Sequence, residues 1–143
     1  MLISTKGRYA LRVLIDMAEH GGDSFIPLSD IAGRQDISEK YLESIVRSLV
    51  KAGILSGMRG KGGGYRLCRK PEDITVYSVL ALTEGELSPV ACLSEGAAPC
   101  PRMASCRTLP LWDGLYTLIR EYLEGRSIAD LTRRDEVGGD YVI

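Results

Sequence analysis

Hydrophobic residues recur at helical spacing in three segments near the start of the chain. In residues 5–20 the apolar positions are Ala10, Val13, Leu14, Met17 and Ala18, and Gly21-Gly22 ends the pattern. Pro27 precedes a second, short helix expected over residues 29–35. Ser38 is a suitable N-cap for a third helix that runs to about residue 52, with its apolar stripe at Leu42, Ile45, Val46 and Leu49. The pattern therefore predicts three helices in quick succession.

A change from helical to alternating periodicity follows the third helix. Residues 54–58 and 65–68 read as short strands on either side of the tip Arg59-Gly60-Lys61-Gly62-Gly63-Gly64, which is typical of a β-hairpin. Three helices followed by a hairpin is the order of a winged helix-turn-helix. We therefore expect a mainly α protein with a small β-hairpin wing. The same architecture also serves as a protein-docking module, so topology alone does not establish DNA binding.

The second half of the chain predicts a helix over 75–84, a loop over 85–107 rich in Gly, Pro, Ser, Ala and Cys, a long helix over 109–124 and a short one over 128–133. The long helix is apolar over most of its circumference, at Leu111, Trp112, Leu115, Tyr116, Leu118, Ile119, Tyr122 and Leu123. So wide an apolar surface in a small protein favours a homodimer in which this helix crosses its copy. The alternative is burial within one chain.

These elements divide the chain by expected role. Residues 1–75 form the DNA-binding winged helix-turn-helix, residues 76–135 form a cysteine-loop sensor and dimerisation region, and residues 136–143 form a flexible tail.

Charge sharpens this division. The 143 residues carry 18 Lys/Arg and 19 Asp/Glu, a net charge of −1 that argues weakly against a nucleic-acid partner. However, residues 1–75 hold 12 basic and 9 acidic residues, whereas residues 76–143 hold 6 and 10. Five basic residues and no acid occur in the hairpin, at Arg59, Lys61, Arg66, Arg69 and Lys70. This placement favours a DNA-reading wing, and the alternative is an exposed hairpin that is basic on one side by chance.

The exposed side of the third helix supplies candidates for base readout. We expect double-stranded DNA to contact Ser38, Lys40, Tyr41, Glu43, Ser44 and Arg47 from this helix, and Arg59 and Lys61 from the wing. A glutamate beside a polyanion is unfavourable unless it accepts a hydrogen bond from cytosine N4, so Glu43 is expected to discriminate bases. The plainer alternative is a solvated helix face with a Glu43–Arg47 ion pair.

Other function classes find little support. The glycine-rich tip lacks the spacing of a phosphate-binding enzyme loop, and His20, the only histidine, is expected at a helix C-terminus, so we expect no enzyme. No apolar run approaches about 18 residues, and the N-terminus lacks the apolar centre of a signal peptide. We therefore expect a cytoplasmic protein with no membrane partner.

Three cysteines fall in the loop before the long helix. Cys92, Cys100 and Cys106 together suit a soft metal or an iron–sulphur cluster, and Arg102 and Arg107 would offset thiolate charge. A thiol–disulfide switch, a zinc site and the absence of any site remain alternatives. Cys68 stands apart on the second strand, where we expect it to act as a small apolar residue.

Several motifs in combination resemble one known family. Residues 4–11 (Ser-Thr-Lys-Gly-Arg-Tyr-Ala-Leu), 37–43 (Ile-Ser-Glu-Lys-Tyr-Leu-Glu), 59–65 and the three-cysteine loop before Leu111-Trp112 are similar to the IscR family of bacterial winged-helix regulators, over about residues 1–132. The resemblance implies a dimeric transcription factor that binds a palindrome-like operator and senses an iron–sulphur cluster, most often 2Fe–2S. It implies that Cys92, Cys100 and Cys106 are the cluster ligands.

The resemblance also carries departures. The position three residues after the last cysteine, histidine in IscR, is Leu109 here, and Arg8 stands where other members place an acid. The fourth ligand is therefore unassigned. A cluster-free branch of the family, which controls cysteine metabolism, implies the alternative of a regulator that responds through thiol oxidation or a partner enzyme.

Overall fold

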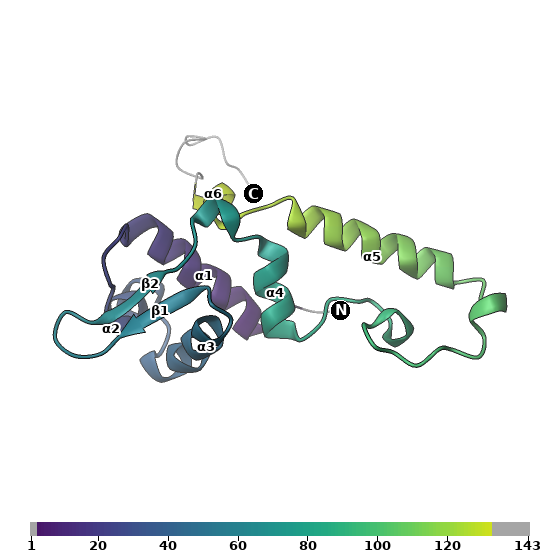
Figure 1. Cartoon of the computed structure of the whole chain (residues 1–143), viewed down its shortest axis with the longest axis horizontal. Helices are drawn as coiled ribbons and strands as arrows, with labels where there is room; N and C mark the ends of the chain where they lie inside the picture. The colour runs from purple at the N-terminus through teal and green to yellow at the C-terminus, as the bar shows by residue number, and fades with distance from the viewer. Residues whose placement is uncertain (1–2, 133–143) are drawn as a thin grey trace.

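The computed structural model describes residues 3–132 and is mainly helical with one antiparallel hairpin. The predicted tail over residues 136–143 lies outside the described residues. In chain order the elements are α1 (Thr5–His20), α2 (Leu28–Gln35), α3 (Glu39–Lys51), β1 (Leu55–Met58), β2 (Gly64–Leu67), η1 (Pro71–Asp73), α4 (Val76–Glu84), η2 (Ala91–Leu93), η3 (Met103–Ser105), α5 (Leu109–Glu124) and α6 (Ile128–Thr132). The predicted winged helix-turn-helix with a long C-terminal helix is confirmed (Figure 1).

Short polar side chains cap the helices that the periodicity predicted. Ser4, Ser38 and Thr75 each accept a hydrogen bond from the backbone N–H three residues further on, at the starts of α1, α3 and α4. Between α2 and α3 the chain changes direction at Asp36, whose φ is 54°. These caps and this left-handed residue set the helix boundaries from local sequence.

The wing contains one pairing that sequence periodicity did not reveal. β1 and β2 pair antiparallel, with Leu55 opposite Leu67. Ile26, from the segment between α1 and α2, exchanges two backbone hydrogen bonds with Tyr65, at 2.8 and 2.9 Å. A Cβ on Gly64 would collide with the Ile26 carbonyl oxygen, so this close approach requires glycine. The hairpin is therefore fastened to the helical body at its second strand.

One main core joins segments from both halves of the chain. It includes Val13 and Leu14 from α1, Leu42 from α3, Val79 from α4 and Ile128 from α6. The Ile128 N–H donates to the Ile74 carbonyl at 2.9 Å, and the Val76 N–H donates to the Arg126 carbonyl at 2.9 Å. After running outward and back, the chain thus re-enters the core of the helix-turn-helix.

Helix α5 projects away from this body, and the loop over 85–107 runs along it to its far end (Figure 1). Within the described residues no helix has the length and apolar character needed to cross a membrane.

A buried carboxylate links α1 to the end of α2. Asp16 is 1% exposed, and its oxygens accept hydrogen bonds from Arg34 Nη2 at 2.7 Å, Arg34 Nε at 2.9 Å and Gln35 Nε2 at 2.9 Å. Burial raises the pKa of Asp16, but the hydrogen bonds from Arg34 and Gln35 and the positive charge of Arg34 outweigh it, so the pKa lies below its ordinary value. The charged form of Asp16 is therefore part of the fold.

We predict that Asp16→Asn lowers the free energy of unfolding by about 2 kcal/mol near neutral pH, because it leaves Arg34 without its carboxylate partner. Because the folded-state pKa is lowered, this stabilisation is present above the ordinary carboxyl pKa and disappears as pH falls through the lowered value. Urea unfolding at about pH 7 and about pH 3 measures both effects. Glu19→Gln, which changes an exposed acid on the same helix, is the control. A loss for Asp16→Asn that is equally large at both pH values contradicts the assignment.

Candidate nucleic-acid interface and cysteine loop

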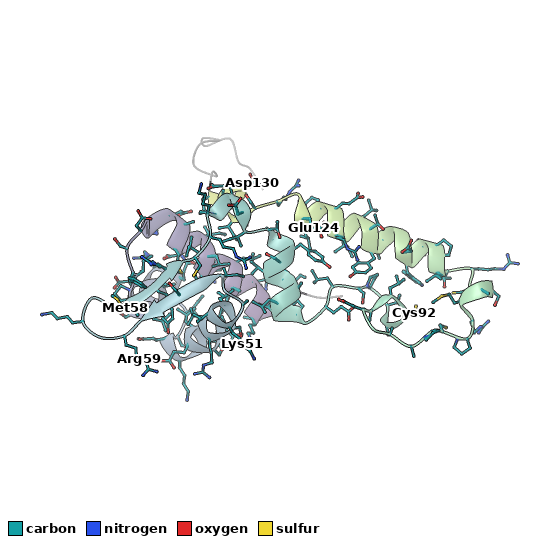
Figure 2. All side chains as sticks on the ribbon, viewed as in Figure 1. Lys51, Met58, Arg59, Cys92, Glu124 and Asp130 are labelled. Atoms are coloured by element: carbon teal, nitrogen blue, oxygen red, sulfur yellow. The ribbon has the colours of Figure 1, made fainter. Side chains whose placement is uncertain are left out.

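A groove of about 1030 Å³ lies between α3 and the wing. Its polar lining comes from Glu39, Glu43, Arg47 and Lys51 on α3 and from Arg59 at the wing tip. Figure 2 shows Lys51, Met58 and Arg59 gathered on this side of the molecule. Among the predicted DNA-binding residues, the structure therefore brings Glu43, Arg47 and Arg59 together around one groove.

The other predicted contacts are exposed but do not line this groove. They are Ser38, Lys40, Tyr41, Ser44 and Lys61. The Ser44 hydroxyl donates to the Tyr41 carbonyl at 2.9 Å, and the Ser38 hydroxyl accepts from the Tyr41 N–H at 3.2 Å. With its proton engaged, Ser44 can act toward a base only as a hydrogen-bond acceptor.

Glu43 and Arg47 do not pair with each other, although both lie within the part of the chain that the structure describes. The alternative of a Glu43–Arg47 ion pair is thus wrong, and both side chains are available to a ligand in the groove. Sequence reasoning missed Glu39, Lys51 and Met58 as lining residues, because only the folded hairpin shows which part of α3 the wing covers.

Glycine shapes the wing tip. Gly60 and Gly62 adopt φ values of 93° and 79°, which favour glycine over other residues. A Cβ on Gly63 would collide with the Met58 carbonyl oxygen. The tip between Arg59 and Gly64 is therefore a narrow turn that exposes its backbone and both basic side chains.

The basic residues of the hairpin do not form a single patch. Arg59 lines the groove beside α3, whereas Arg66 lies over the Phe25 ring, 4.6 Å from its centroid, in a separate hollow with Asp23. Strand alternation explains the separation, because Tyr65 and Leu67 pack against the core and Arg66 points the other way.

The same alternation corrects the expectation for Cys68. It follows the last residue of β2 and is exposed rather than buried as a small apolar residue. His20, as expected, is the last residue of α1, and its Nδ1 lies 2.9 Å from the Asp16 carbonyl oxygen.

The three loop cysteines are free thiols. Cys92 lies in η2, Cys106 follows η3, and all three, Cys100 included, are partly exposed. Figure 2 places Cys92 at the opposite end of the molecule from Arg59. Over residues 3–132 no group of three His, Cys, Asp or Glu side chains is close enough to hold a metal ion. The loop thus carries three thiols that the structure does not bring together.

Cys106 differs from an ordinary exposed thiol. Its Sγ lies 3.4 Å from the Thr108 hydroxyl, and this hydrogen bond, with backbone N–H groups at the start of α5 and the charge of Arg102, holds the Cys106 pKa below its ordinary value. A lowered pKa favours the thiolate, which is the form that binds metals. The chemistry of this donor set therefore fits an iron–sulphur cluster, whose ligands are thiolates.

Helix α5 is largely left exposed by residues 3–132. Leu111 is 62% exposed, Leu118 65% and Tyr122 58%. Its inner side contacts α4, where the Tyr77 and Tyr116 hydroxyls lie 3.4 Å apart. An apolar hollow of about 700 Å³ remains open, lined by Ile3, Leu80, Leu118, Ile119, Glu121, Tyr122 and Leu123. The part of the chain that the structure describes therefore does not bury this helix, as the alternative to dimerisation required.

A helix-turn-helix with a fastened wing and a groove lined by three basic and two acidic side chains beside its third helix defines the class of winged-helix proteins. The Rrf2 family, described as iron-dependent transcriptional regulators, matches residues 3–134, and the chain belongs to this family. It is therefore a transcriptional regulator and not an enzyme, as the sequence predicted.

Relatives and solved structures agree with this assignment. The chain is 41% identical over 133 residues to protein rrf2 of Nitratidesulfovibrio vulgaris, covering 93% of this chain and 88% of the relative. It is 38% identical to the regulator IscR of Aliivibrio salmonicida over 137 residues, which are 96% of this chain and 80% of that one.

Among solved structures, CymR, the global cysteine regulator of B. subtilis, is similar with a TM-score of 0.74 and 35% identity, covering 92% of this chain and 96% of that one. IscR of T. potens is similar with a TM-score of 0.73 and 32% identity, covering 99% and 94%. The resemblance to an IscR-type regulator is confirmed, and the family also includes the cysteine regulator.

Proposed function

We propose that this regulator is a homodimer that reads a palindrome-like operator with α3 and the wing, under the control of an iron–sulphur cluster held by Cys92, Cys100 and Cys106. DNA reading is assigned to residues 1–75, and sensing and dimerisation to residues 76–135. The observation that carries the proposal is the groove between α3 and the wing, where Arg47, Lys51 and Arg59 face the same space.

The exposed residues in and beside the groove have distinct roles toward DNA. Lys40, Arg47 and Lys61 are exposed cations suited to phosphates, and their contacts fix the register of α3 on the duplex. Within residues 3–132 Glu43 makes no ion pair, and as a hydrogen-bond acceptor it suits the amino group of cytosine in the major groove. Arg59, at the base of the glycine tip, suits an adjacent narrow minor groove. Ser38, Tyr41 and Ser44 complete the surface at the start of α3.

Dimerisation follows from the open face of α5. A second copy of the same helix offers a matching apolar surface, and a two-fold axis between the helices would present two wings to two half-sites of DNA. The regulator would act in the cytoplasm, where the bacterial chromosome lies.

The cysteine loop is placed to connect a sensor to this dimer. Bound to three thiolates, an iron–sulphur cluster supplies a redox-active and removable iron centre. Cys106 lies three residues before α5, and Cys92 lies eight residues after the end of α4. Bringing these thiolates together would order the loop and fix the outer end of α5 relative to α4. The fourth ligand stays unassigned.

A cluster-free regulator is the second candidate. The observation that favours it is that residues 3–132 gather no three metal-binding side chains, together with the similarity to CymR, a cysteine regulator. In this case the free thiols, above all Cys106, respond to oxidants, or a partner enzyme binds the C-terminal half.

We predict that Arg59→Ala weakens binding to an operator duplex selected by the wild-type protein, and lowers the slope of log affinity against log salt by about 1. Fluorescence anisotropy at several salt concentrations measures both effects. Arg66→Ala is the matched control, because it removes the same charge from the same hairpin but outside the groove. Equal losses for the two variants would contradict the assigned groove.

We predict that Leu118→Glu converts the dimer to a monomer, because it places a charge in the open apolar hollow of α5 and weakens association by about a hundredfold or more. Sedimentation velocity measures the mass. Thr117→Glu adds the same charge to the same helix at an exposed polar position and should leave the dimer intact. A wild-type monomer, or a dimeric Leu118→Glu, rejects α5 as the interface.

We predict that protein purified without oxygen absorbs at about 320–420 nm and contains iron and sulphide. The Cys100→Ser variant should lack the absorption, the iron and the sulphide. Cys68→Ser, which changes the exposed cysteine outside the loop, should retain them. Colourless wild-type protein without iron supports the cluster-free candidate instead.

A further inference from the structure

An aromatic pair joins α1 to the first turn of α3. The Tyr9 and Tyr41 rings meet edge to face, with centroids 5.7 Å apart and an interplanar angle of 87°. This arrangement is favoured because the electropositive edge of one ring meets the electronegative face of the other. Tyr9 is half-buried and packs against the main core, whereas Tyr41 remains 37% exposed on the side of α3 that faces outward. The Tyr9 ring is therefore anchored against the core, and the Tyr41 ring lies at the surface.

Tyr9 is itself held from a second direction. The Arg12 guanidinium lies over the Tyr9 ring, 4.9 Å from its centroid. Arg12 Nε donates to Gln35 Oε1 at 3.1 Å, and Arg12 Nη2 donates to the Gln35 carbonyl oxygen. Gln35 is the last residue of α2, and its side-chain amide donates to the buried Asp16 carboxylate. A continuous set of contacts thus runs from the buried charge to Tyr9.

The Tyr41 backbone is fixed as well, because its N–H donates to the Ser38 cap and its carbonyl accepts from Ser44. In the part of the chain that the structure describes, the Tyr41 hydroxyl makes no hydrogen bond. A phenol with a fixed ring and a free hydroxyl can donate to an acceptor at a definite place. A side chain held in advance loses little conformational entropy on binding.

We propose that Tyr9 is a positioning residue for sequence discrimination, acting through the Tyr41 ring at the start of the recognition helix. Arg12 and Gln35 hold Tyr9 in place, and Tyr9 holds Tyr41 so that its hydroxyl and ring edge meet one base step of the operator. This inference rests on the proposed reading of DNA by α3. It adds α1, which contributes no residue to the groove, to the determinants of specificity.

The contribution to specificity separates this role from a merely structural one. Loss of the Tyr9 ring would let Tyr41 move, which weakens contacts to particular bases but leaves the phosphate contacts of Lys40, Arg47 and Lys61 unchanged. We therefore expect binding to the selected operator to weaken and binding to unrelated DNA to stay the same. A general loosening of the fold would weaken both.

The test uses the full-length protein and a duplex selected by the wild type from a random-sequence library, with a scrambled duplex of the same length as the competitor. Tyr9→Leu should lower the ratio of operator to scrambled affinity by about tenfold, with the salt slope unchanged. Tyr9→Phe keeps the ring contact and should retain the wild-type ratio. Tyr9→Leu combined with Tyr41→Leu should be no worse than Tyr41→Leu alone, because Tyr9 acts through Tyr41.

Three outcomes overturn the inference: equal losses on both duplexes, a Tyr9→Leu ratio that matches the wild type, or additive losses in the double variant. If Tyr9→Leu does not fold, Arg12→Met removes the guanidinium that holds Tyr9 and should lower the same ratio by about threefold. An unchanged ratio in Arg12→Met then also overturns it. If the wild type enriches no sequence from the library, the proposed binding of DNA by α3 is itself overturned. This failure is distinguishable from failure of the Tyr9 inference, because the selection comes before any variant is measured.

Discussion

The Asp16 carboxylate is enclosed by protein and stays charged, and the geometry of the reading domain depends on it. A buried charge is tolerated only when its hydrogen-bonding capacity is filled, and Arg34 and Gln35 fill it from the last turn of α2. Because these residues immediately precede the turn at Asp36, the pairing fixes where α2 ends relative to α1. The start of α3, which carries the predicted base contacts, is set from that point.

A second constraint connects the second half of the chain to this domain. Ile128 of α6 is fully buried in the same core as α1 and α3, so the chain that leaves α5 is tied directly into the reading domain. At its other end α5 is joined to the cysteine loop, and its inner side contacts α4. A change in how the loop holds the outer end of α5 can therefore reach the helix-turn-helix through α6, which follows α5 in the chain and is packed in its core. This arrangement provides a structural connection through which the cysteine loop could control DNA binding, as proposed.

Local signals predicted most of the fold. The long helix over 109–124 and the helix after Ser38 follow from apolar periodicity, caps and terminal glycines, which act within a few residues. The prediction that Cys68 is a small apolar strand residue was wrong, because the exposure of its side chain depends on which face of β2 the core covers. The Ile26–Tyr65 bridge and the entry of Ile128 into the core join distant segments, and a single sequence carries no periodic signal for such contacts.

In the candidate site, too, local features could be predicted from the sequence and contacts between distant segments could not. The recognition helix and the wing could be identified from residue type and order, whereas their shared groove could not, because it depends on the angle between α3 and the hairpin. Composition suggested one basic patch, but strand alternation separates Arg59 from Arg66. The contact between Tyr9 and Tyr41, on which the proposed role of Tyr9 rests, could not be predicted for a related reason: the two residues lie on different helices, 32 positions apart, and meet only in the folded protein.

The most direct test of the account is the operator affinity of one preparation before and after its cluster is removed by an iron chelator without oxygen. If the loop controls the reading domain through α5, affinity should change by about five- to 150-fold, the usual range of allosteric coupling. The Cys100→Ser variant, which lacks a ligand, should show no change under the same treatment. Equal affinities for the cluster-loaded and cluster-free wild type would contradict control of DNA binding by the cysteine loop.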